Sequence, residues 1–462
     1  MSARRAALAL TLGLLGWSAV ARANGRFPFA QQVVIGPGSR SDVVVLRTTF
    51  GLLVSRDGGA SFRWVCEDSM FFPYVPGLMV DPAVEVTSEG RVALSFESGV
   101  HSFTDGCQVR RHAPTADHDV IDLAATPAGD TLYGVESTAG SPSYVLRGGA
   151  ALDLARVGSP LPGLRFATVE VAASEPRRIY LSAVEERSRE PRLLRSDDAG
   201  ETVRALMVPG STLGDGAYVS GVDPTDADVL YVRAVVGFGS DLLRSSDGGA
   251  SFRRVAATRD AMLGFAISDD GRTVWYGSQA EGVFRSSDRG QSFERVNALP
   301  TLCLRQHAGV LWACTDWISQ RWALGRSMDG GASFTAVLRF GDVAGPPECA
   351  SPDEGAMICG ERWPTQRAAL EDPGPPPDAG SRLDVPLADV ASPGDVAPAD
   401  DGPVPQDVPP VFDAGARDSA AVPPPAPSAS CDCRATPRAA SRAPWLGLAL
   451  GLALASRRRF QL

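Results

Sequence analysis

Histidines and acidic residues gather at one place in the chain, the octapeptide HAPTADHD that starts at His112. Imidazole and carboxylate groups bind zinc and harder cations, so this segment has the composition of a metal site. Its candidate ligands are His112, Asp117, His118 and Asp119. The proline and polar residues favour a connecting loop, and no third ligand is indicated by the spacing. We therefore predict no metal site.

Nucleophilic catalysis has little support from the residue types. The chain contains no lysine, which excludes Schiff-base and P-loop chemistry, and no G-x-S-x-G elbow. Its 54 acidic residues supply candidates for the two carboxylates that a glycoside hydrolase needs, but no spacing selects a pair. With a formal net charge of −10 the chain has no basic stripe for phosphates, so we expect neither a nucleic-acid partner nor a cofactor.

An eight-residue pattern recurs in the segments that would have to position any site. It reads SRDGGASF from Ser55, SSDGGASF from Ser245, SSDRGQSF from Ser286 and SMDGGASF from Ser327. A short aspartate side chain accepts hydrogen bonds from the N–H groups of its own loop, and glycine adopts positive φ angles readily. Apolar runs flank the pattern, which therefore predicts a turn between two neighbouring strands.

The pattern resembles the Asp-box (BNR-type) repeat, S-x-D-x-G-x-[ST]-[FW]. This turn occurs once per blade in β-propellers such as sialidases, sortilin-type receptors and photosystem assembly factors. The resemblance spans Phe50 to Phe340 and implies that the boxes are scaffold. The structural aspartates would be Asp57, Asp105, Asp198, Asp247, Asp288 and Asp329.

The spacing of the repeats predicts the number of blades. The intervals from Asp57 through Asp198, Asp247 and Asp288 to Asp329 are 141, 49, 41 and 41 residues, and a period of forty to fifty residues is typical of propeller blades. Two weaker copies fill the first interval: SFTDGCQV, with Asp105, and LRGGAAL, in which Gly148 and Gly149 align with Gly248 and Gly249.

Each unit contains four short apolar runs, such as AYVSGVDP, VLYVRAVV, DLLRSS and FRRV. We therefore predict an all-β fold, a seven-bladed β-propeller of four-stranded antiparallel blades, over residues 24–370. Val343 to Leu370 is left over after the seventh unit. It is expected to latch the ring or to begin an incomplete eighth blade.

A sialidase-like glycoside hydrolase, with carboxylates at the propeller channel, is the alternative function. Such an enzyme would carry an Arg-Ile-Pro motif near its start, whereas this chain has Arg26-Phe27-Pro28. Glu170 with Tyr180 and Glu136 with Tyr133 are candidate carboxylate and tyrosine pairs that no spacing rule selects.

The first residues of the chain predict an export signal. Residues 1–23 contain Arg4 and Arg5, an apolar stretch and the small-residue site Ala-Arg-Ala, which together are typical of a signal peptide. The mature protein is expected to start near Asn24.

The C-terminal part has the composition of a stalk and an anchor. Residues 371–430 contain 15 prolines, 11 acidic and two basic residues, as in a disordered, extended spacer. Residues 431–462 contain Cys431 and Cys433, a short apolar segment at 443–455 and an arginine cluster. This order resembles the C-terminal sorting signal of myxobacterial surface proteins, which implies that these cysteines are the processing or anchoring point. An uncleaved transmembrane helix is the alternative, although the apolar segment is shorter than the usual span of about 20 residues.

The other six cysteines predict three disulfides, as expected in an exported chain without CxxC spacing. Cys303 and Cys314 flank a predicted hairpin, and Cys349 and Cys359 lie ten residues apart, so each pair is close enough to bridge. Cys66 and Cys107 would form the third pair by elimination.

These observations together predict an exported, monomeric propeller at the cell surface, associated with the outer membrane or secreted. We expect it to be a non-catalytic recognition or assembly module, and the expected ligand is a protein or a glycan.

Overall fold

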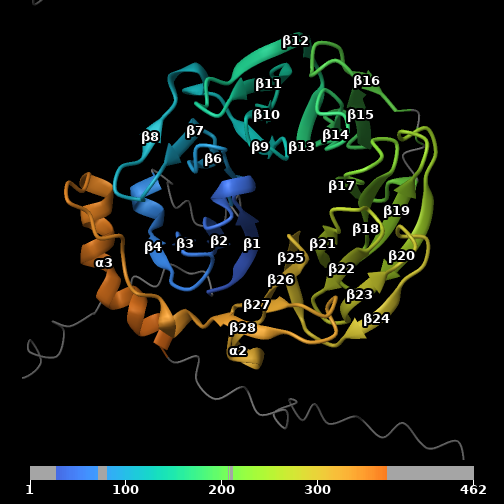
Figure 1. The fold of residues 1–462 in the computed structure, drawn as a ribbon. Helices are drawn as coiled ribbons and strands as arrows, with labels where there is room; N and C mark the ends of the chain where they lie inside the picture. The colour runs from blue at the N-terminus through green and yellow to red at the C-terminus, as the bar shows by residue number, and fades with distance from the viewer. Residues whose placement is uncertain (1–27, 71–80, 207, 209–211, 372–462) are drawn as a thin grey trace, which may run out of the picture. The chain divides into compact units, whose positions relative to one another are not determined.

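The computed structural model describes residues 28–70, 81–206, 208 and 212–371. Within these residues, strands β1 to β28 form seven four-stranded sheets in a ring around a central channel (Figure 1). Each sheet consists of four consecutive strands that pair antiparallel in chain order. This arrangement confirms the predicted seven-bladed β-propeller.

The first four blades follow one another from the N-terminus. Blade 1 contains β1 (Ala30–Ile35), β2 (Val44–Thr48), β3 (Gly51–Ser55) and β4 (Arg63–Val65). Blade 2 contains β5 (Val84–Val86), β6 (Val92–Phe96), β7 (Gly99–Phe103) and β8 (Arg110–Arg111). Blade 3 contains β9 (Val120–Ala125), β10 (Thr131–Glu136), β11 (Ser143–Gly149) and β12 (Ala155–Leu161). Blade 4 contains β13 (Leu164–Val171), β14 (Ile179–Glu185), β15 (Pro191–Ser196) and β16 (Arg204–Ala205).

The remaining blades complete the ring, with few helices. Blade 5 contains β17 (Gly216–Val222), β18 (Leu230–Val236), β19 (Gly239–Ser245) and β20 (Arg253–Thr258). Blade 6 contains β21 (Met262–Ile267), β22 (Val274–Ser278), β23 (Gly282–Ser286) and β24 (Glu294–Asn297). Blade 7 contains β25 (Thr301–His307), β26 (Val310–Thr315), β27 (Leu324–Ser327) and β28 (Thr335–Leu338). The helices are α2 (Trp317–Gln320), α3 (Glu354–Glu371) and the short 3₁₀ turns η1 (Gly38–Arg40), η2 (Glu67–Met70), η3 (Ala113–Thr115) and η5 (Phe340–Asp342).

The two faces of the ring follow from the order of the strands. Every blade begins with its innermost strand and has four antiparallel strands, so all seven innermost strands begin on the same face, here called the entry face. The turn between the third and fourth strands of each blade lies on the opposite face, here called the turn face. The recurring aspartate turns therefore lie on the turn face.

Apolar residues on neighbouring blades form the core. Leu46 and Trp64 of blade 1 are buried in one cluster with Leu324 of blade 7, so this cluster also closes the ring. No strand is exchanged at this closure, because blade 1 and blade 7 each consist of four consecutive strands. A blade cannot bury both of its faces alone, and stacking in a ring provides the missing contacts.

Polar contacts also join neighbouring blades at the turn face. The Arg195 guanidinium donates to the Gly248 carbonyl of the next blade at 3.1 Å. Arg147 and Arg244 make the corresponding bonds, to Ala199 at 3.2 Å and to Arg289 at 2.8 Å. Each of these arginines lies on the third strand of its blade and holds the aspartate turn of the next one. These bonds satisfy carbonyl groups that the turns leave without a strand partner.

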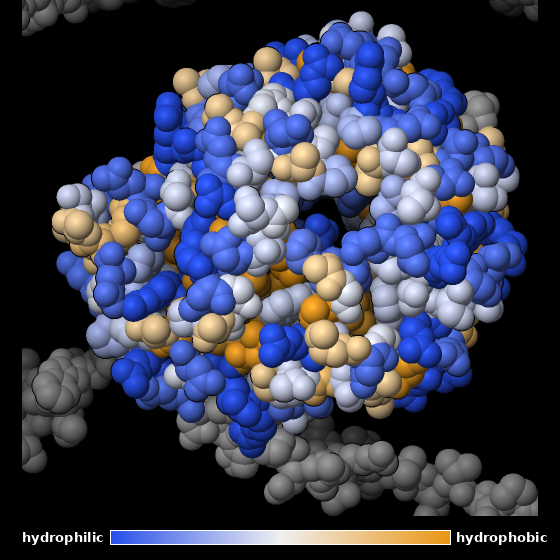
Figure 2. Space-filling model, in the orientation of Figure 1, coloured by the Kyte–Doolittle hydropathy of each residue, from blue (hydrophilic) through white to orange (hydrophobic). Residues whose placement is uncertain are grey.

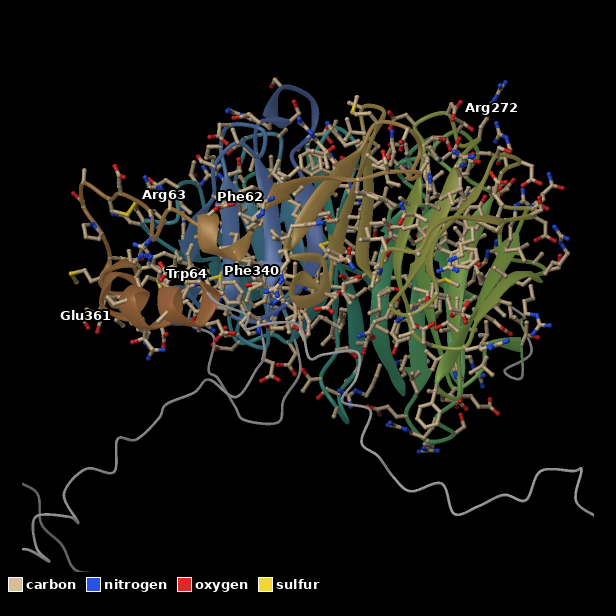
Figure 3. The ribbon with its side chains drawn as sticks, turned by 90° about the horizontal axis from the view of Figure 1, so that it is seen from below. Phe62, Arg63, Trp64, Arg272, Phe340 and Glu361 are labelled. Atoms are coloured by element: carbon tan, nitrogen blue, oxygen red, sulfur yellow. A yellow bond between two sulfur atoms is a disulfide. The ribbon has the colours of Figure 1, made fainter. Side chains whose placement is uncertain are left out.

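The segment 343–371, here called the clasp, covers the outer edge of blade 1. Trp64 N–H on β4 donates to the Gly345 carbonyl at 2.8 Å, and the Trp64 ring packs against Trp363 of α3 at 5.6 Å between centroids. Figure 3 shows Trp64 and Phe340 beside α3, with Glu361 on its outer side. The clasp forms an α-helix and adds no strand to any sheet. The leftover segment therefore latches the ring and does not begin an eighth blade.

One of the three predicted disulfides has the expected partners, Cys303 and Cys314 on β25 and β26. The predictions of Cys349–Cys359 and Cys66–Cys107 are wrong. Cys359 bonds to Cys66 of blade 1, and Cys349 bonds to Cys107 of blade 2. Cys359 lies on α3 and Cys349 lies on the preceding extended segment, so the two side chains face different blades. Proximity in sequence was therefore a poor guide to their pairing.

The predicted signal peptide (1–23), nearly all of the predicted stalk (371–430), and the predicted sorting segment (431–462) with Cys431 and Cys433 lie outside the described residues. No helix in the described part of the chain is long and apolar enough to cross a membrane.

Candidate functional site

A cavity of about 530 Å³ lies in the central channel. Figure 2 shows the opening at the centre of the ring, with hydrophobic residues beside it. The cavity is lined by residues at or near the starts of innermost strands, such as Ala30, Met262 and Leu302, and it therefore lies toward the entry face. The aspartate turns lie on the other face. The repeated motif and this channel cavity are thus at opposite ends of the blades.

Three arginines line this cavity: Arg47 on β2, Arg233 on β18 and Arg305 on β25. The Arg47 guanidinium donates to the Pro82 carbonyl at 2.8 Å. Arg233 donates to the Met262 carbonyl at 2.9 Å and lies 4.7 Å from the centroid of the Tyr218 ring.

Arg305 differs from the other two arginines. Its side chain is exposed, and its guanidinium has no hydrogen bond or ion pair to any residue of the described chain. A guanidinium group offers five N–H donors in a planar fork that suits an anion. Arg305 is therefore the arginine of the cavity with the most donors free for a ligand.

Three carboxyl groups lie on the innermost strands of successive blades: Glu85 on β5, Asp122 on β9 and Glu170 on β13. Burial raises the pKa of Glu85 to about 7, although Arg305 opposes the shift. Burial also raises the pKa of Asp122 to about 7 and that of Glu170 to about 8, and the charges of Asp122 and Glu85 add to the shift of Glu170. The Asp122 carboxylate accepts from the Val169 N–H at 2.9 Å.

These pKa values give the channel a positive balance near neutral pH. The three guanidinium groups are charged, whereas at pH 7 Glu85 and Asp122 are about half protonated and Glu170 is mostly protonated. Apolar side chains, including Phe265 and Leu263, form other parts of the wall. The combination suits a ligand that has an anionic group and an apolar part.

Of these channel residues, only Glu170 was among the candidates predicted from the sequence. Its proposed partner, Tyr180, is its cross-strand neighbour, but the Tyr180 hydroxyl donates to the Ala227 carbonyl at 2.7 Å between blades. In the other proposed pair, Tyr133 donates to the Pro176 carbonyl at 2.9 Å. Glu136 instead binds the Arg156 guanidinium at 2.5 and 2.8 Å. Neither pair places a tyrosine hydroxyl on its carboxylate. Of the Arg-Phe-Pro segment, only Pro28 is described, and its carbonyl accepts from Trp317 Nε1 at 2.6 Å.

The histidine-rich segment connects blades 2 and 3, where the loop was expected. Its polar groups are directed at separate neighbours: His112 lies 2.8 Å from the Ser102 hydroxyl, Asp117 binds Arg111 at 2.6 Å, and His118 lies 3.4 Å from Glu136. Within the described residues, no group of three or more histidine, cysteine or acidic side chains is arranged to hold a metal ion. The two remaining histidines, His101 and His307, lie on β7 and β25.

Five aspartate turns share one hydrogen-bond pattern, shown here for Asp247. Its carboxylate accepts from the Ser245 hydroxyl at 2.8 Å, the Ser251 N–H at 2.9 Å and the Ser251 hydroxyl at 2.6 Å. The buried Ser245 hydroxyl in turn accepts from the Gly249 N–H at 2.9 Å. The same bonds recur around Asp57, Asp198, Asp288 and Asp329.

The hydrogen bonds in these turns shift the pKa of the aspartate, and the turn backbone leaves room only for glycine at one position. Hydrogen bonds from Thr202 lower the pKa of Asp198 to about 2, because they favour the ionised carboxylate. Gly249 has a φ of 87°, and a Cβ atom there would lie 2.4 Å from Leu206 Cδ1. All the partners of these aspartates lie within their own turns, so the pattern is structural.

The two weaker repeats differ from this pattern. Asp105 accepts from the Cys107 N–H at 2.9 Å, and Phe103 occupies the place of the first serine. In blade 3, Gly148 and Gly149 belong to β11 and do not have positive φ angles, unlike Gly248 and Gly249. Asp153 supplies the acceptor there, to the Gly149 N–H at 2.8 Å. The expected alignment of these glycines is therefore wrong for blade 3.

Reasoning from the sequence missed Arg47, Arg233, Arg305, Glu85 and Asp122. A usable signal was present at some of these positions. Glu85 stands between Val84 and Val86, and Asp122 stands between Ile121 and Leu123, so each is a lone charge in an apolar innermost strand. A charged residue in such a position faces either the channel or a partner.

No protein-family model matches the chain, and a search of curated proteins finds no match. Among solved structures, a GH74 xyloglucanase from Xanthomonas campestris is 15% identical with a TM-score of 0.33, and the match covers 71% of this chain and 66% of that one. For the GH74 enzyme from Niastella koreensis the match covers 62% of that chain. This chain thus spans less than two thirds of the length of both enzymes.

Two further structures are similar. Hydrazine synthase from Kuenenia stuttgartiensis is 10% identical with a TM-score of 0.48, and the match covers 68% of this chain and all of that one. YCF48 bound to D1 peptide is 11% identical with a TM-score of 0.33, and the match covers 47% of this chain and 67% of that one. At these identities the similarities concern the fold alone.

Proposed function

We propose that this protein is an exported, surface-displayed propeller that acts as a non-catalytic recognition module and binds an anionic ligand in its channel. The observation that carries the proposal is the cavity of about 530 Å³ with three guanidinium groups on its wall. With pKa values of about 7, 7 and 8, the three neighbouring carboxyl groups are at least half protonated at pH 7, so they cancel only part of this positive charge. The three disulfides agree with an exported protein.

Arg305 provides the test of this site. The mature full-length protein would be titrated with small carboxylates that carry an apolar group, using calorimetry at pH 7. We expect Arg305→Ala to weaken binding at least tenfold, since a charge-assisted hydrogen-bond pair contributes about 1.5–3 kcal/mol. Arg272→Ala is the matched control, because Arg272 is an exposed arginine on the turn face, far from the clasp in Figure 3. Equal affinity of the two variants would contradict the proposed site.

Glycoside hydrolysis is the second candidate function, favoured by the three channel acids. A glycosidase needs an acid with a raised pKa beside a carboxylate that stays ionised, so that the two pKa values differ. Here the pKa values of Glu85, Asp122 and Glu170 are all raised. The channel therefore lacks a carboxylate of ordinary acidity among these three, which favours recognition over hydrolysis.

Hydrolysis can be tested separately from binding. Purified protein would be incubated with aryl glycosides of neutral and acidic sugars, and Glu170→Gln would be measured beside it. Turnover that this substitution abolishes would overturn the non-catalytic proposal. We expect no turnover above that of a heat-denatured sample.

A further inference from the structure

The cavity wall changes in chemical character from one blade to the next. Arg305 of blade 7 offers unpaired donors, and the adjacent β1 of blade 1 contributes Gln31 and Gln32. The side-chain carbonyl oxygens of both glutamines are buried without a hydrogen-bond partner in the described structure. Buried acceptors of this kind are costly unless a donor reaches them. Two residues of the cavity wall therefore have buried acceptors without a partner, beside an exposed guanidinium that no described residue binds.

Acidic side chains lie on the next three blades around the channel. Blades 2, 3 and 4 contribute Glu85, Asp122 and Glu170, in that order. Glu85 and Glu170 make no ion pair with any described residue, and both are close enough to Arg305 to be affected by its charge. Asp122 is affected by Arg47. The channel thus has the donors of Arg305 on one side and these carboxyl groups on the other.

A ligand with only a carboxylate would satisfy half of this arrangement. It would pair with Arg305 but would leave the glutamine carbonyls and the carboxyl groups without a donor. An ammonium group supplies three N–H donors and one positive charge, which suit neutral carbonyl acceptors and ionised carboxylates. In an α-amino acid both groups are on one carbon atom, and an apolar side chain would face Phe265 and Leu263.

We propose that the channel ligand is a free α-amino acid with an apolar side chain, whose carboxylate pairs with Arg305 and whose ammonium group binds beside Gln31 and Gln32, on the side of the channel toward Glu85 of β5. This inference rests on the proposed function, because it specifies the ligand of the same cavity. A cavity of about 530 Å³ is large enough for such a molecule together with ordered water.

Proton release on binding is an independent consequence. Glu85 has a pKa of about 7 and is therefore largely protonated at pH 6.5 in the empty channel. An ammonium group beside it favours the ionised form, so the carboxyl group loses its proton when the ligand binds. The other charged or titratable groups near it are Arg305, which already favours ionisation, and Asp122 and Glu170, whose negative charge opposes it.

Three ligands that share a phenyl group separate the two proposals. Calorimetric titrations of the mature full-length protein would compare L-phenylalanine with 3-phenylpropanoate, which lacks the ammonium group, and phenethylamine, which lacks the carboxylate. Titrations at pH 6.5 in buffers of different ionisation enthalpy would count the protons released. We expect phenylalanine to bind at least tenfold more tightly than either analogue and to release protons, and 3-phenylpropanoate to release none.

Substitutions test which residue binds each end of the ligand. Glu85→Gln should lower the affinity for phenylalanine to the level of 3-phenylpropanoate, and the affinity for 3-phenylpropanoate should not change. Arg305→Ala should weaken the binding of both ligands. Arg272→Ala should change the affinity for neither ligand. Thermal melts would show that each variant is folded. If 3-phenylpropanoate binds as tightly as phenylalanine, the amino-acid inference is wrong and the anionic site stands. If phenethylamine binds as tightly as phenylalanine, or no ligand binds the folded protein, both proposals are overturned.

Discussion

The aspartates of the turn face belong to the scaffold at the scale of single residues. Asp247 holds Ser245 and Ser251, and all three are distant from the channel cavity along the blade. Its removal leaves the buried Ser245 hydroxyl without its acceptor. We expect Asp247→Ala to lower the free energy of unfolding by about 1–2 kcal/mol, the usual effect of one or two lost hydrogen bonds, and to leave ligand affinity unchanged.

Chemical denaturation and titration of the same preparation measure both quantities. Asp105→Ala is the matched control, because the Asp105 carboxylate has one backbone donor, Cys107 N–H, and should lose less stability. Loss of binding in Asp247→Ala with an unchanged unfolding curve would show that the turn face takes part in recognition.

The raised pKa of Glu170 predicts how the free energy of unfolding depends on pH. Its pKa is raised to about 8 from an ordinary value of 4.5, first by burial and then by Asp122 and Glu85. Between these pH values the folded state holds a proton that the unfolded chain has released, so the free energy of unfolding falls as pH rises. The destabilisation of the folded state by Glu170 is absent below about pH 4.5 and complete above about pH 8.

Thermal melts between pH 5 and 8.5 test this dependence. Glu170→Gln cannot ionise, so its melting temperature should fall less over this range than that of the parent protein. Glu361→Gln, on the outer side of α3, serves as the control and should follow the parent (Figure 3). Identical slopes for Glu170→Gln and the parent would indicate that Glu170 is already ionised in the fold.

At the scale of elements, the clasp carries two disulfides that join distant parts of the chain. Cys66 and Cys359 are 293 residues apart, whereas Cys303 and Cys314 are 11 apart. With Cys107–Cys349 intact, Cys66–Cys359 closes a loop of about 50 residues, made of 66–107 and 349–359, which in the chain-entropy model adds about 1–1.5 kcal/mol more stability than the 11-residue loop. We expect Cys66→Ser with Cys359→Ser to be markedly less stable than Cys303→Ser with Cys314→Ser, as measured by denaturant unfolding. Equal losses would mean that α3 holds its place through packing alone.

The strands were predictable from sequence because turn residues punctuate every apolar run. The observed β17, β18 and β19 match three such runs within one or two residues. The clasp was not predictable to the same degree, because the partners of Cys349 and Cys359 depend on where α3 packs in three dimensions. The channel site was missed for a related reason: Arg305 and Glu85 belong to no repeated motif and come together only when the ring closes.

At the scale of the whole molecule, the described domain ends with the clasp. Leu370 is 1% exposed and packs in the cluster that joins blades 7 and 1. A chain that stops after Glu371 should therefore be secreted as a folded propeller with all three disulfides. Non-reducing peptide mapping and the melting temperature of the secreted product would check this. A product that aggregates or is retained would show that the fold requires residues beyond the clasp.

The cysteines near the C-terminus give a separate prediction about display. On the proposed surface display, Cys431→Ser with Cys433→Ser should leave the domain folded but wrongly retained or released. Surface labelling of whole cells, with the secreted fraction measured in parallel, would detect the change. Unaltered display would make the apolar segment 443–455 the sole anchor.

The clasp also determines how the domain would respond to mechanical tension. The ring closes between blades 7 and 1 by side-chain packing, without an exchanged strand. A pull on the chain beyond Glu371 would enter α3 and pass through two sulfur–sulfur bonds, one into blade 1 and the other into blade 2. Leu370, near the end of α3, packs in the seam, but the two disulfides would bear the load in parallel with this packing. A propeller attached in this way could be dragged by a moving surface or a bound particle without its ring being opened.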